Sequence, residues 1–388
     1  MVTIGYLFVT TQHHKLITRA QMPDYLRLIA LFGIVVVNVQ FMAFPDSANF
    51  PFNTGFSGFD RVTVLLVNGL ALTKSYGLFS FMFGVGLGFL MQSVERRGLP
   101  FGRVYRNRMI GLLVLGLLHG CLFFFGDILV IYAVTGSILY LMRNWAVRRL
   151  VKWGVVLLVL QTAIVAATML AALFVDPAVT AEHDAWAKTV MTTGGIADVI
   201  QYRSSEYLFF LPFGLMFQGL GALGWFCLGL ASVRSGMIDN PDHQQWKNAR
   251  RICLVPGVAG SLLGAVLVLN GHSIWGIVLV VVAAPVATVG YLGLIAAMPK
   301  PKSRMAKTIL AAGGASLSVY LGQSIILSWI FSGYGLGLWS GVSWTVATGT
   351  ALLVTAFLIA SVAMWQSRFG TPPFERLLRR ITYAGSRG

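Results

Sequence analysis

Two polar residues, His119 and Asp127, lie inside or at the edge of the apolar stretch MIGLLVLGLLHGCLFFFGDILVIYAVTG. An imidazole or a carboxylate at membrane depth is energetically costly, and such groups usually face a bundle interior or a water-filled cavity. Imidazole is also the usual proton acceptor near neutral pH, and a carboxylate can orient its ring. The pair therefore indicates a buried polar site, with His119 as candidate catalytic base and Asp127 as its partner.

A structural role is the alternative for both residues. His119 can bridge helices by hydrogen bonding, and Asp127 can cap the helix that follows it. The two residues are eight positions apart across a short turn, a spacing that allows contact without requiring it. Both interpretations stay open at this point, and His119 is the better functional candidate.

The composition is that of a polytopic membrane protein. Of the 388 residues, 56% are hydrophobic and 11% are charged, whereas soluble domains have about 25% charged residues. The mean hydropathy is +0.76. The net charge is +16, but the basic residues lie in short clusters between apolar runs, as in cytoplasmic loops that contact anionic lipids. Nucleic-acid binding is therefore not expected.

Ten apolar segments are long enough to cross a membrane, which takes about 20 residues. We expect these spans at residues 26–44, 76–94, 109–125, 127–142, 151–175, 207–233, 252–269, 274–298, 309–331 and 342–365. Segment 59–73 is apolar but short, and we expect a partial or interfacial helix there. The predicted fold class is therefore all-α: a polytopic membrane helix bundle of about ten transmembrane helices plus one partial or interfacial helix.

The basic residues indicate how the bundle is oriented. With the N-terminus inside, 25 of the 29 Lys and Arg fall on the inner side, a strong positive-inside bias. The outer side keeps only Arg61, Lys74, Lys188 and Arg203. Both termini are thus expected to be cytoplasmic. We expect a cytoplasmic segment 1–25, a single transmembrane domain 26–366 with an extracytoplasmic loop at about 176–206, and a basic cytoplasmic tail 367–388.

Further polar residues lie at several depths, as a cavity that crosses much of the membrane requires. Asp24 and Arg27 are three positions apart at the inner mouth of the first span, which predicts a structural ion pair on one helix face. Arg27 can also bind the phosphates of a coenzyme A donor arriving from the cytoplasm. The other candidate substrate-binding residues are Asn38, Lys74, Glu206, Tyr320 and Gln323. Of these, Lys74 and Glu206 either line an acceptor entrance on the outer side or anchor span ends.

Other site motifs are missing from the sequence. No His, Cys, Asp or Glu spacing fits a metal site, and no Walker or Gly-x-Ser-x-Gly motif is present. Gly84, Gly86 and Gly88 in FGVGLGF follow no strand, so they indicate close helix packing rather than a nucleotide loop.

Four parts of the chain carry a more specific pattern. They are RAQMPDYLRLIALFGIVVVNVQFMAF (19–44), KSYGLFSFMFGVGLGF (74–89), RNRMIGLLVLGLLHGCLFFFGDILVIYAVTG (106–136), and, at the C-terminus, GGASLSVYLGQSIILSWIFSGYGLGL (313–338) with WQSRFGTPPFERLLRRITY (365–383). This combination resembles the DUF418 (YeiB-like) family of bacterial integral membrane proteins. Leu28 stands where the family pattern has glycine.

The DUF418 family distantly resembles the acyltransferase-3 and heparan glucosaminide acetyltransferase groups of membrane enzymes. Those enzymes move an acyl group from a cytoplasmic thioester to an extracytoplasmic acceptor, using a buried His and nearby Arg residues. The resemblance thus implies a multi-pass acyltransferase-like protein of the bacterial cytoplasmic (inner) membrane. It implies acyl-CoA as donor substrate, no covalently bound cofactor, membrane lipids as partners and a glycan or lipid as acceptor.

The resemblance also implies roles for residues of this chain. His119 would be the base and Asp127 its orienting partner, while Arg27 and Asn38 would line the donor channel. Two other functional classes stay open: a transporter or flippase of a small organic solute or lipid, and a non-catalytic membrane partner protein. Transporters often carry internal repeats, and the lack of self-similarity between the two halves favours the enzyme.

Overall fold

The computed structural model describes residues 21–45, 56–171 and 181–386. These residues form helices and no strand, so the predicted all-α bundle is confirmed. The helices are α1 Met22–Ala43, α2 Gly58–Leu66, α3 Lys74–Arg96, α4 Phe101–Leu122, α5 Leu129–Met142, α6 Val147–Ala171, α7 Ala181–Thr193, α8 Ile196–Arg234, α9 Gln244–Asn248, α10 Leu254–Leu269, α11 Ser273–Ala296, α12 Arg304–Ala312, α13 Ser316–Phe331, α14 Trp344–Phe369 and α15 Pro373–Thr382.

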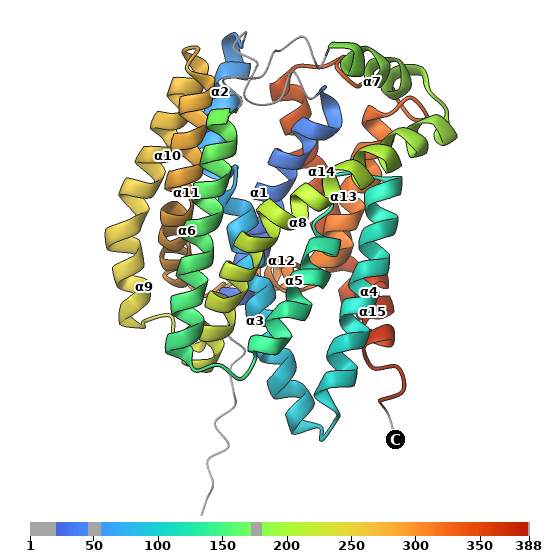
Figure 1. Cartoon of the computed structure of the whole chain (residues 1–388). Helices are drawn as coiled ribbons and strands as arrows, with labels where there is room; N and C mark the ends of the chain where they lie inside the picture. The colour runs from blue at the N-terminus through green and yellow to red at the C-terminus, as the bar shows by residue number, and fades with distance from the viewer. Residues whose placement is uncertain (1–20, 46–55, 172–180, 387–388) are drawn as a thin grey trace, which may run out of the picture.

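Each predicted span overlaps one or more of these helices (Figure 1). Within the described residues, eight helical stretches are long and apolar enough to cross a membrane. The other two predicted spans are α4 and α5. The first turns of α4 carry several arginines, and α5 has 14 residues, a length of ~21 Å.

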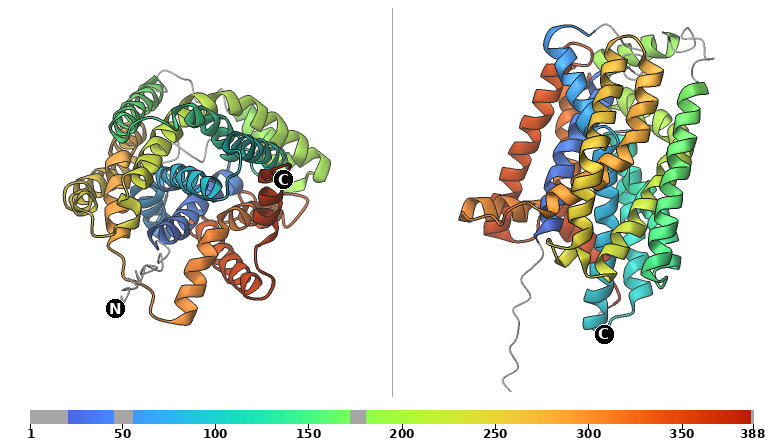
Figure 2. Two further views of the ribbon diagram at one scale, coloured as in Figure 1. Left: turned by 90° about the horizontal axis from the view of Figure 1, so that it is seen from below. Right: turned by 90° about the vertical axis from the view of Figure 1, so that its left-hand side faces the viewer.

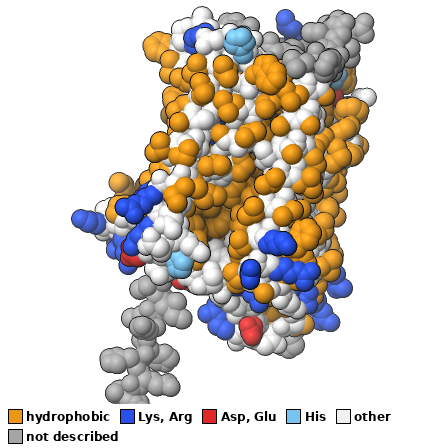
Figure 3. Space-filling view, turned by 60° about the vertical axis from the view of Figure 1, so that its left-hand side comes forward, with side chains coloured by type: hydrophobic (Ala, Val, Ile, Leu, Met, Phe, Trp, Pro, Cys, Tyr) orange, Lys and Arg blue, Asp and Glu red, His pale blue; other side chains and the backbone are white. Residues whose placement is uncertain are grey.

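The distribution of charge along the bundle agrees with the predicted orientation. Figure 3 shows Lys and Arg side chains gathered near the lower end, below a broad band of hydrophobic side chains. Helix α1 begins at the same end of the bundle at which α15 lies (Figure 1). We call this end of the bundle the basic end; the positive-inside rule predicts that it faces the cytoplasm.

The expected partial helix at 59–73 is part of a broken span. Helix α2 and the π-helical turn η2 (Val67–Ala71) run from the upper end of the bundle toward α3. The path is interrupted at Thr73, a non-glycine residue with a φ of 64°. This backbone region is unfavourable for residues with a Cβ, so the break is held by its surroundings. Lys74 follows directly and begins α3.

Helix α8 is longer than the predicted span. It begins at Ile196, inside the segment expected as an extracytoplasmic loop, and α7 occupies part of the rest. No proline or glycine interrupts residues 196–211, so nothing in this stretch stops a helix. Figure 1 shows α8 crossing the bundle obliquely from the end near α7.

The ninth predicted span is divided in two. Residue 309 lies in α12, which Figure 2 shows lying across the bundle axis rather than along it. Helix α13 then runs along the axis. Its first residue is Ser316, so the part of this segment that runs along the bundle starts later than the hydropathy predicts.

Helices α1 and α3 lie at the centre of the bundle when it is viewed along its axis (Figure 2). Helix α3 packs closely on α8 because glycines face each other there. A Cβ on Gly84 would overlap the carbonyl of Phe226, and a Cβ on Gly229 would overlap the carbonyl of Phe81. Backbones can approach this closely in a membrane only where side chains are absent.

Adding a methyl group at this contact is expected to destabilise the fold. Gly84→Ala places a Cβ against the α8 backbone, and overpacking of this kind costs about 1–3 kcal/mol. Gly86→Ala is the matched control, because no heavy atom lies within 4 Å of its Cβ position. Thermal unfolding of the detergent-solubilised protein should show a lower midpoint for Gly84→Ala only. Equal midpoints for the two variants would contradict this packing.

Candidate functional site

The site is built at the junction of α4 and α5. His119 lies three residues before the end of α4, and Asp127 lies in the short connection to α5. Their side chains are 1% and 0% exposed, respectively. In Figure 1, α7 and the first part of α8 lie above the end of α4. Asp127 therefore lies buried inside the protein at this end of the bundle.

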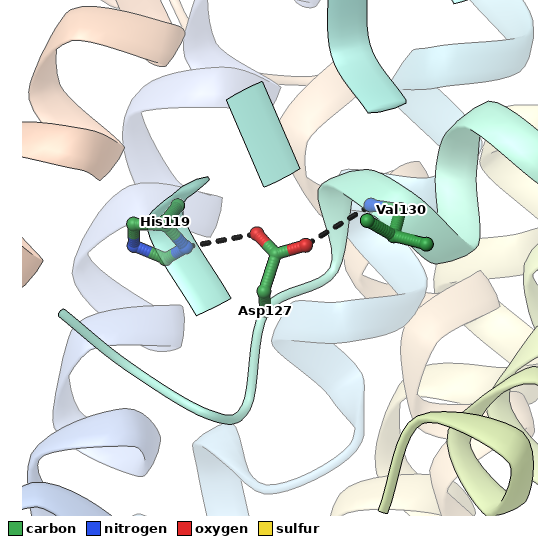
Figure 4. Close-up of polar contacts among 3 residues, drawn as sticks. All are labelled: His119, Asp127 and Val130. Atoms are coloured by element: carbon green, nitrogen blue, oxygen red, sulfur yellow. Dashed lines mark hydrogen bonds and ion pairs between the residues drawn. The ribbon is translucent and has the colours of Figure 1, made fainter. Parts of the chain in front are cut away.

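His119 and Asp127 are in direct contact (Figure 4). Asp127 Oδ1 lies 2.8 Å from His119 Nδ1, and Asp127 Oδ2 accepts a hydrogen bond of 3.0 Å from the backbone N–H of Val130. Val130 lies in the first turn of α5, so the carboxylate also caps that helix. Asp127 therefore does both things that the sequence left open: it contacts His119 and it caps α5.

The hydrogen bond to Asp127 determines which ring nitrogen of His119 can act as a base. An ionised carboxylate only accepts hydrogen bonds, so the neutral imidazole must carry its proton on Nδ1. The lone pair is then on Nε2. This atom is buried and has no hydrogen-bond partner among the residues that the structure describes. The geometry leaves a buried proton acceptor free for another group.

Glycines on α4 allow the loop and a neighbouring helix to approach the dyad. A Cβ on Gly116 would lie 2.8 Å from Asp127 Oδ2 and 2.7 Å from the nitrogen of Val130. A Cβ on Gly120 would overlap the ring of Tyr207 in α8. The sequence Gly-x-x-His-Gly thus leaves the space into which Asp127 and Tyr207 fit.

A cavity lies between this dyad and the basic end of the bundle, and we call it the inner cavity. Its lining includes Arg27, Phe79, Gly86, Arg108, Tyr132 and Tyr320. Tyr320 connects it to the dyad, because its ring centroid lies 5.0 Å from that of His119. The two guanidinium groups come from the inner ends of α1 and α4. An anionic group could bind between them while an apolar chain extends toward Tyr320.

A second cavity lies on the other side of the dyad, and we call it the outer cavity. It is lined by Phe41, Phe44, Phe124, Tyr202, Arg203 and Trp339, among others. Phe124 connects this cavity to the dyad, because its ring packs edge-on against His119 at a centroid distance of 6.5 Å. His119 therefore has an aromatic neighbour from each cavity.

Residues 232–385 match the family model described as "Protein of unknown function (DUF418)". The C-terminal part of the chain is therefore similar to the DUF418 family. It is 28% identical over 385 residues to "Uncharacterized protein YxaH" of Bacillus subtilis (strain 168), which covers 93% of each chain. It is 26% identical over 380 residues to "Uncharacterized protein YeiB" of Escherichia coli (strain K12), covering 92% of this chain and 95% of that protein. No solved structure matches the chain significantly.

Three of the predicted polar residues make contacts within the bundle: Asp24 and Arg27 within α1, and Gln323 between helices. Asp24 and Arg27 form the predicted ion pair at 3.2 Å, and Arg27 also lines the inner cavity. Gln323 is buried and donates hydrogen bonds to the carbonyl of Leu31 and to Thr355 Oγ1. This amide joins α13 to α1 and α14, which is a structural role.

Asn38, Lys74 and Glu206 do not lie beside His119 in either cavity lining. Asn38 is half-buried in α1. Lys74 is fully buried at the break between η2 and α3, where its Nζ donates a 2.9 Å hydrogen bond to the carbonyl of Asn68. Glu206 is buried in α8, and its Oε2 lies 3.5 Å from His183 Nε2 of α7. Neither Lys74 nor Glu206 is an exposed anchor at a span end.

Two arginines that were not among the predicted site residues line the cavities. Arg108 lines the inner cavity and Arg203 the outer one. In the sequence, each is simply one of the basic residues on one side of the predicted spans. A helical projection of the segment around Arg203 could have indicated that it is buried, since Arg203 and Glu206 are three positions apart on one helix face.

Proposed function

We propose that this protein is a membrane acyltransferase. It moves an acyl group from a cytoplasmic thioester donor to a hydroxyl or amine of an extracytoplasmic or lipid-linked acceptor. The observation that supports this most is the buried His119–Asp127 dyad, in which Nε2 has no partner among the described residues. The His119 ring contacts one aromatic residue of each cavity, Tyr320 and Phe124. A base at this position can take a proton from an acceptor on one side while a donor approaches from the other.

The thioester, the acceptor and His119 together account for every bond and proton in the transfer. The acceptor oxygen or nitrogen attacks the thioester carbonyl carbon, and His119 Nε2 takes the proton it loses. The new C–O or C–N bond forms, and the C–S bond breaks. The coenzyme A sulfur leaves as a thiolate and takes the proton back from the imidazolium. Asp127 keeps the ring in position and stabilises its positive charge.

The inner cavity supports a coenzyme A donor. Phosphate groups bind well to guanidinium groups because the planar fork of N–H donors fits their oxygens. Arg27 and Arg108 lie at the cytoplasmic part of the cavity lining, and aromatic residues line the way toward Tyr320. Arg27 already pairs with Asp24. Arg108 has no hydrogen-bonded or salt-bridged partner within the described residues, so it is the stronger candidate for a phosphate.

Removing the charge of Arg108 is expected to weaken donor binding. Arg108→Gln should raise the dissociation constant for coenzyme A by about tenfold to a hundredfold, as for the loss of a charge-assisted contact. Arg106→Gln is the matched control, because Arg106 lies two residues away on α4 and is exposed. Isothermal titration of coenzyme A into the purified protein measures both. Equal weakening by the two substitutions would indicate general attraction by the basic end of the bundle instead.

The proposed location is the bacterial cytoplasmic membrane, with the basic end of the bundle facing the cytoplasm. Acyl-CoA thioesters are made in the cytoplasm, and the inner cavity lies toward that end. Anionic lipids of the inner leaflet would contact the same basic end. The acceptor would reach the dyad from the outer cavity, as a glycan or lipid.

One observation favours transport as a second candidate. The span formed by α2, η2 and α3 is broken within the bundle, and Lys74 lies buried at the break. Transporters use discontinuous helices of this kind to bind solutes and ions near the membrane midplane. Such a carrier would move a small organic solute or a lipid without consuming a thioester.

The two candidates differ in what they leave chemically changed. Cells that make the protein should contain an acylated envelope lipid or glycan that is missing from cells without it, as detected by mass spectrometry. Membranes from the first cells should also release free coenzyme A from acyl-CoA. If the envelopes are identical and no coenzyme A is released, acyl transfer is excluded for the donors tested and transport becomes the leading function.

A further inference from the structure

Arg203 is an unusual residue of the outer cavity. It lies in α8 and is 3% exposed. Its Nη1 donates to the carbonyl of Leu122 at 3.1 Å, to Ser328 Oγ at 2.6 Å and to the hydroxyl of Tyr334 at 3.3 Å. Its Nη2 donates to Ser332 Oγ at 2.6 Å. These partners come from α4, α13 and the turn after α13, and all of them are neutral.

In the part of the chain that the structure describes, the hydrogen-bond partners of this guanidinium are all neutral. Within residues 21–45, 56–171 and 181–386, no carboxylate lies at salt-bridge distance from it. Glu206, one turn further along α8, contacts His183 instead. A buried positive charge that is matched only by neutral oxygens is costly, because the charge has lost its water without gaining a counterion.

Part of the guanidinium is still available for a ligand. The group has five N–H donors in a planar fork. The bonds above use Nη1 and one hydrogen of Nη2. In the part of the chain that the structure describes, the Nε–H and the second Nη2–H have no acceptor. Two N–H groups of one guanidinium can bind two oxygens of a carboxylate or phosphate.

Arg203, with its two unused N–H groups, lies close to the His119–Asp127 dyad. Arg203 lines the outer cavity together with aromatic rings such as Tyr202 and Trp339. It also donates to the carbonyl of Leu122, three residues after His119 in α4. Phe124 belongs to the same cavity and packs on the His119 ring. An anion held by Arg203 would thus be held on the outer side of the catalytic base.

We propose that Arg203 binds an oxyanion, a carboxylate or phosphate group, in the outer cavity. The neutral hydroxyls and the carbonyl hold the guanidinium in place, and the oxyanion supplies the missing negative charge. The aromatic lining contacts the uncharged body of the same molecule. That this molecule is the acyl acceptor depends on the function proposed above. The anion site itself does not.

Binding of small anions tests this proposal without any acyl transfer. Inorganic phosphate and acetate are titrated separately into the full-length protein in a neutral detergent, with glycerol as the uncharged control, and heat is measured calorimetrically. Wild type should bind at least one of the two anions and should not bind glycerol. The preferred anion distinguishes a phosphate from a carboxylate ligand.

Three variants complete the design. Arg203→Gln should weaken anion binding by about tenfold or more, since it removes a buried charge partner. Arg203→Lys keeps the positive charge but loses the planar fork of N–H donors, so it should also bind the anion weakly. It provides the test if Arg203→Gln folds poorly. Lys188→Gln is the matched control, because Lys188 is an exposed cation of α7 at the same end of the bundle. It should bind like wild type.

The outcomes separate the two proposals. Equal anion affinity in wild type, Arg203→Gln and Arg203→Lys would overturn the anion site. His119→Gln should keep anion binding whether or not His119 is catalytic. If anion binding depends on Arg203 but the protein transfers no acyl group, the anion site is supported. Only the proposed acyl transfer is then excluded.

Discussion

Replacing His119 with glutamine is expected to abolish acyl transfer while the protein still folds. Glutamine fills a similar space, and its side-chain N–H can donate to Asp127 as the imidazole does, so the carboxylate keeps its partner. The variant lacks a nitrogen lone pair where Nε2 lies, and it cannot take a proton from the acceptor. Loss of a general base lowers rates by about 10²–10⁴. Quantification of the acylated envelope product by mass spectrometry measures this loss.

His272→Gln serves as the control for the same chemical change. His272 is exposed before α11 and lies in neither cavity lining. Its substitution should leave product levels at the wild-type value. If His119→Gln also makes product at the wild-type level, His119 only joins helices and the dyad has no catalytic role.

Replacing Asp127 with asparagine should also cause a large loss of activity, for a different reason. The asparagine carbonyl oxygen can still accept the hydrogen bond from the N–H of Val130, so the cap of α5 is kept. Its NH₂ group would then face His119 Nδ1 as a donor, which moves the imidazole proton to Nε2. A protonated Nε2 cannot act as a base, and we expect a loss of about a hundredfold or more.

A second variant at the same position separates capping from orientation. Asp127→Ala removes both the cap and the contact with His119, so it should lower the thermal unfolding midpoint as well as the activity. Asp127→Asn should unfold close to the wild-type midpoint. If Asp127→Asn retains full activity and only Asp127→Ala is impaired, the carboxylate serves the helix alone.

Much of the fold could be predicted from the sequence because the membrane imposes simple rules. Every backbone group must be hydrogen-bonded within a helix, so apolar runs such as 26–44 and 342–365 correspond to α1 and α14. The cost of ionisable groups at membrane depth also pointed directly to His119 and Asp127. The spacing of eight residues allowed their contact, and the structure shows it.

Other parts of the site could not be predicted because they depend on tertiary packing. Lys74 follows an apolar run and resembles a charge at a span end, but the break at Thr73 places it inside the bundle. Arg203 and Glu206 resemble loop residues until α7 and α13 supply their partners. Hydropathy averages over a segment, so it does not register which neighbours cover a single side chain.

The most direct test of the account follows the thioester itself. Purified protein is reconstituted into vesicles made from lipids of its host membrane, supplied with radiolabelled acetyl-CoA, and assayed for free coenzyme A and for label in the lipid fraction. Wild type and Arg106→Gln should release coenzyme A and label the lipids at similar rates, whereas His119→Gln and Asp127→Asn should do neither. Release and labelling by His119→Gln at the wild-type rate would contradict a catalytic His119–Asp127 dyad.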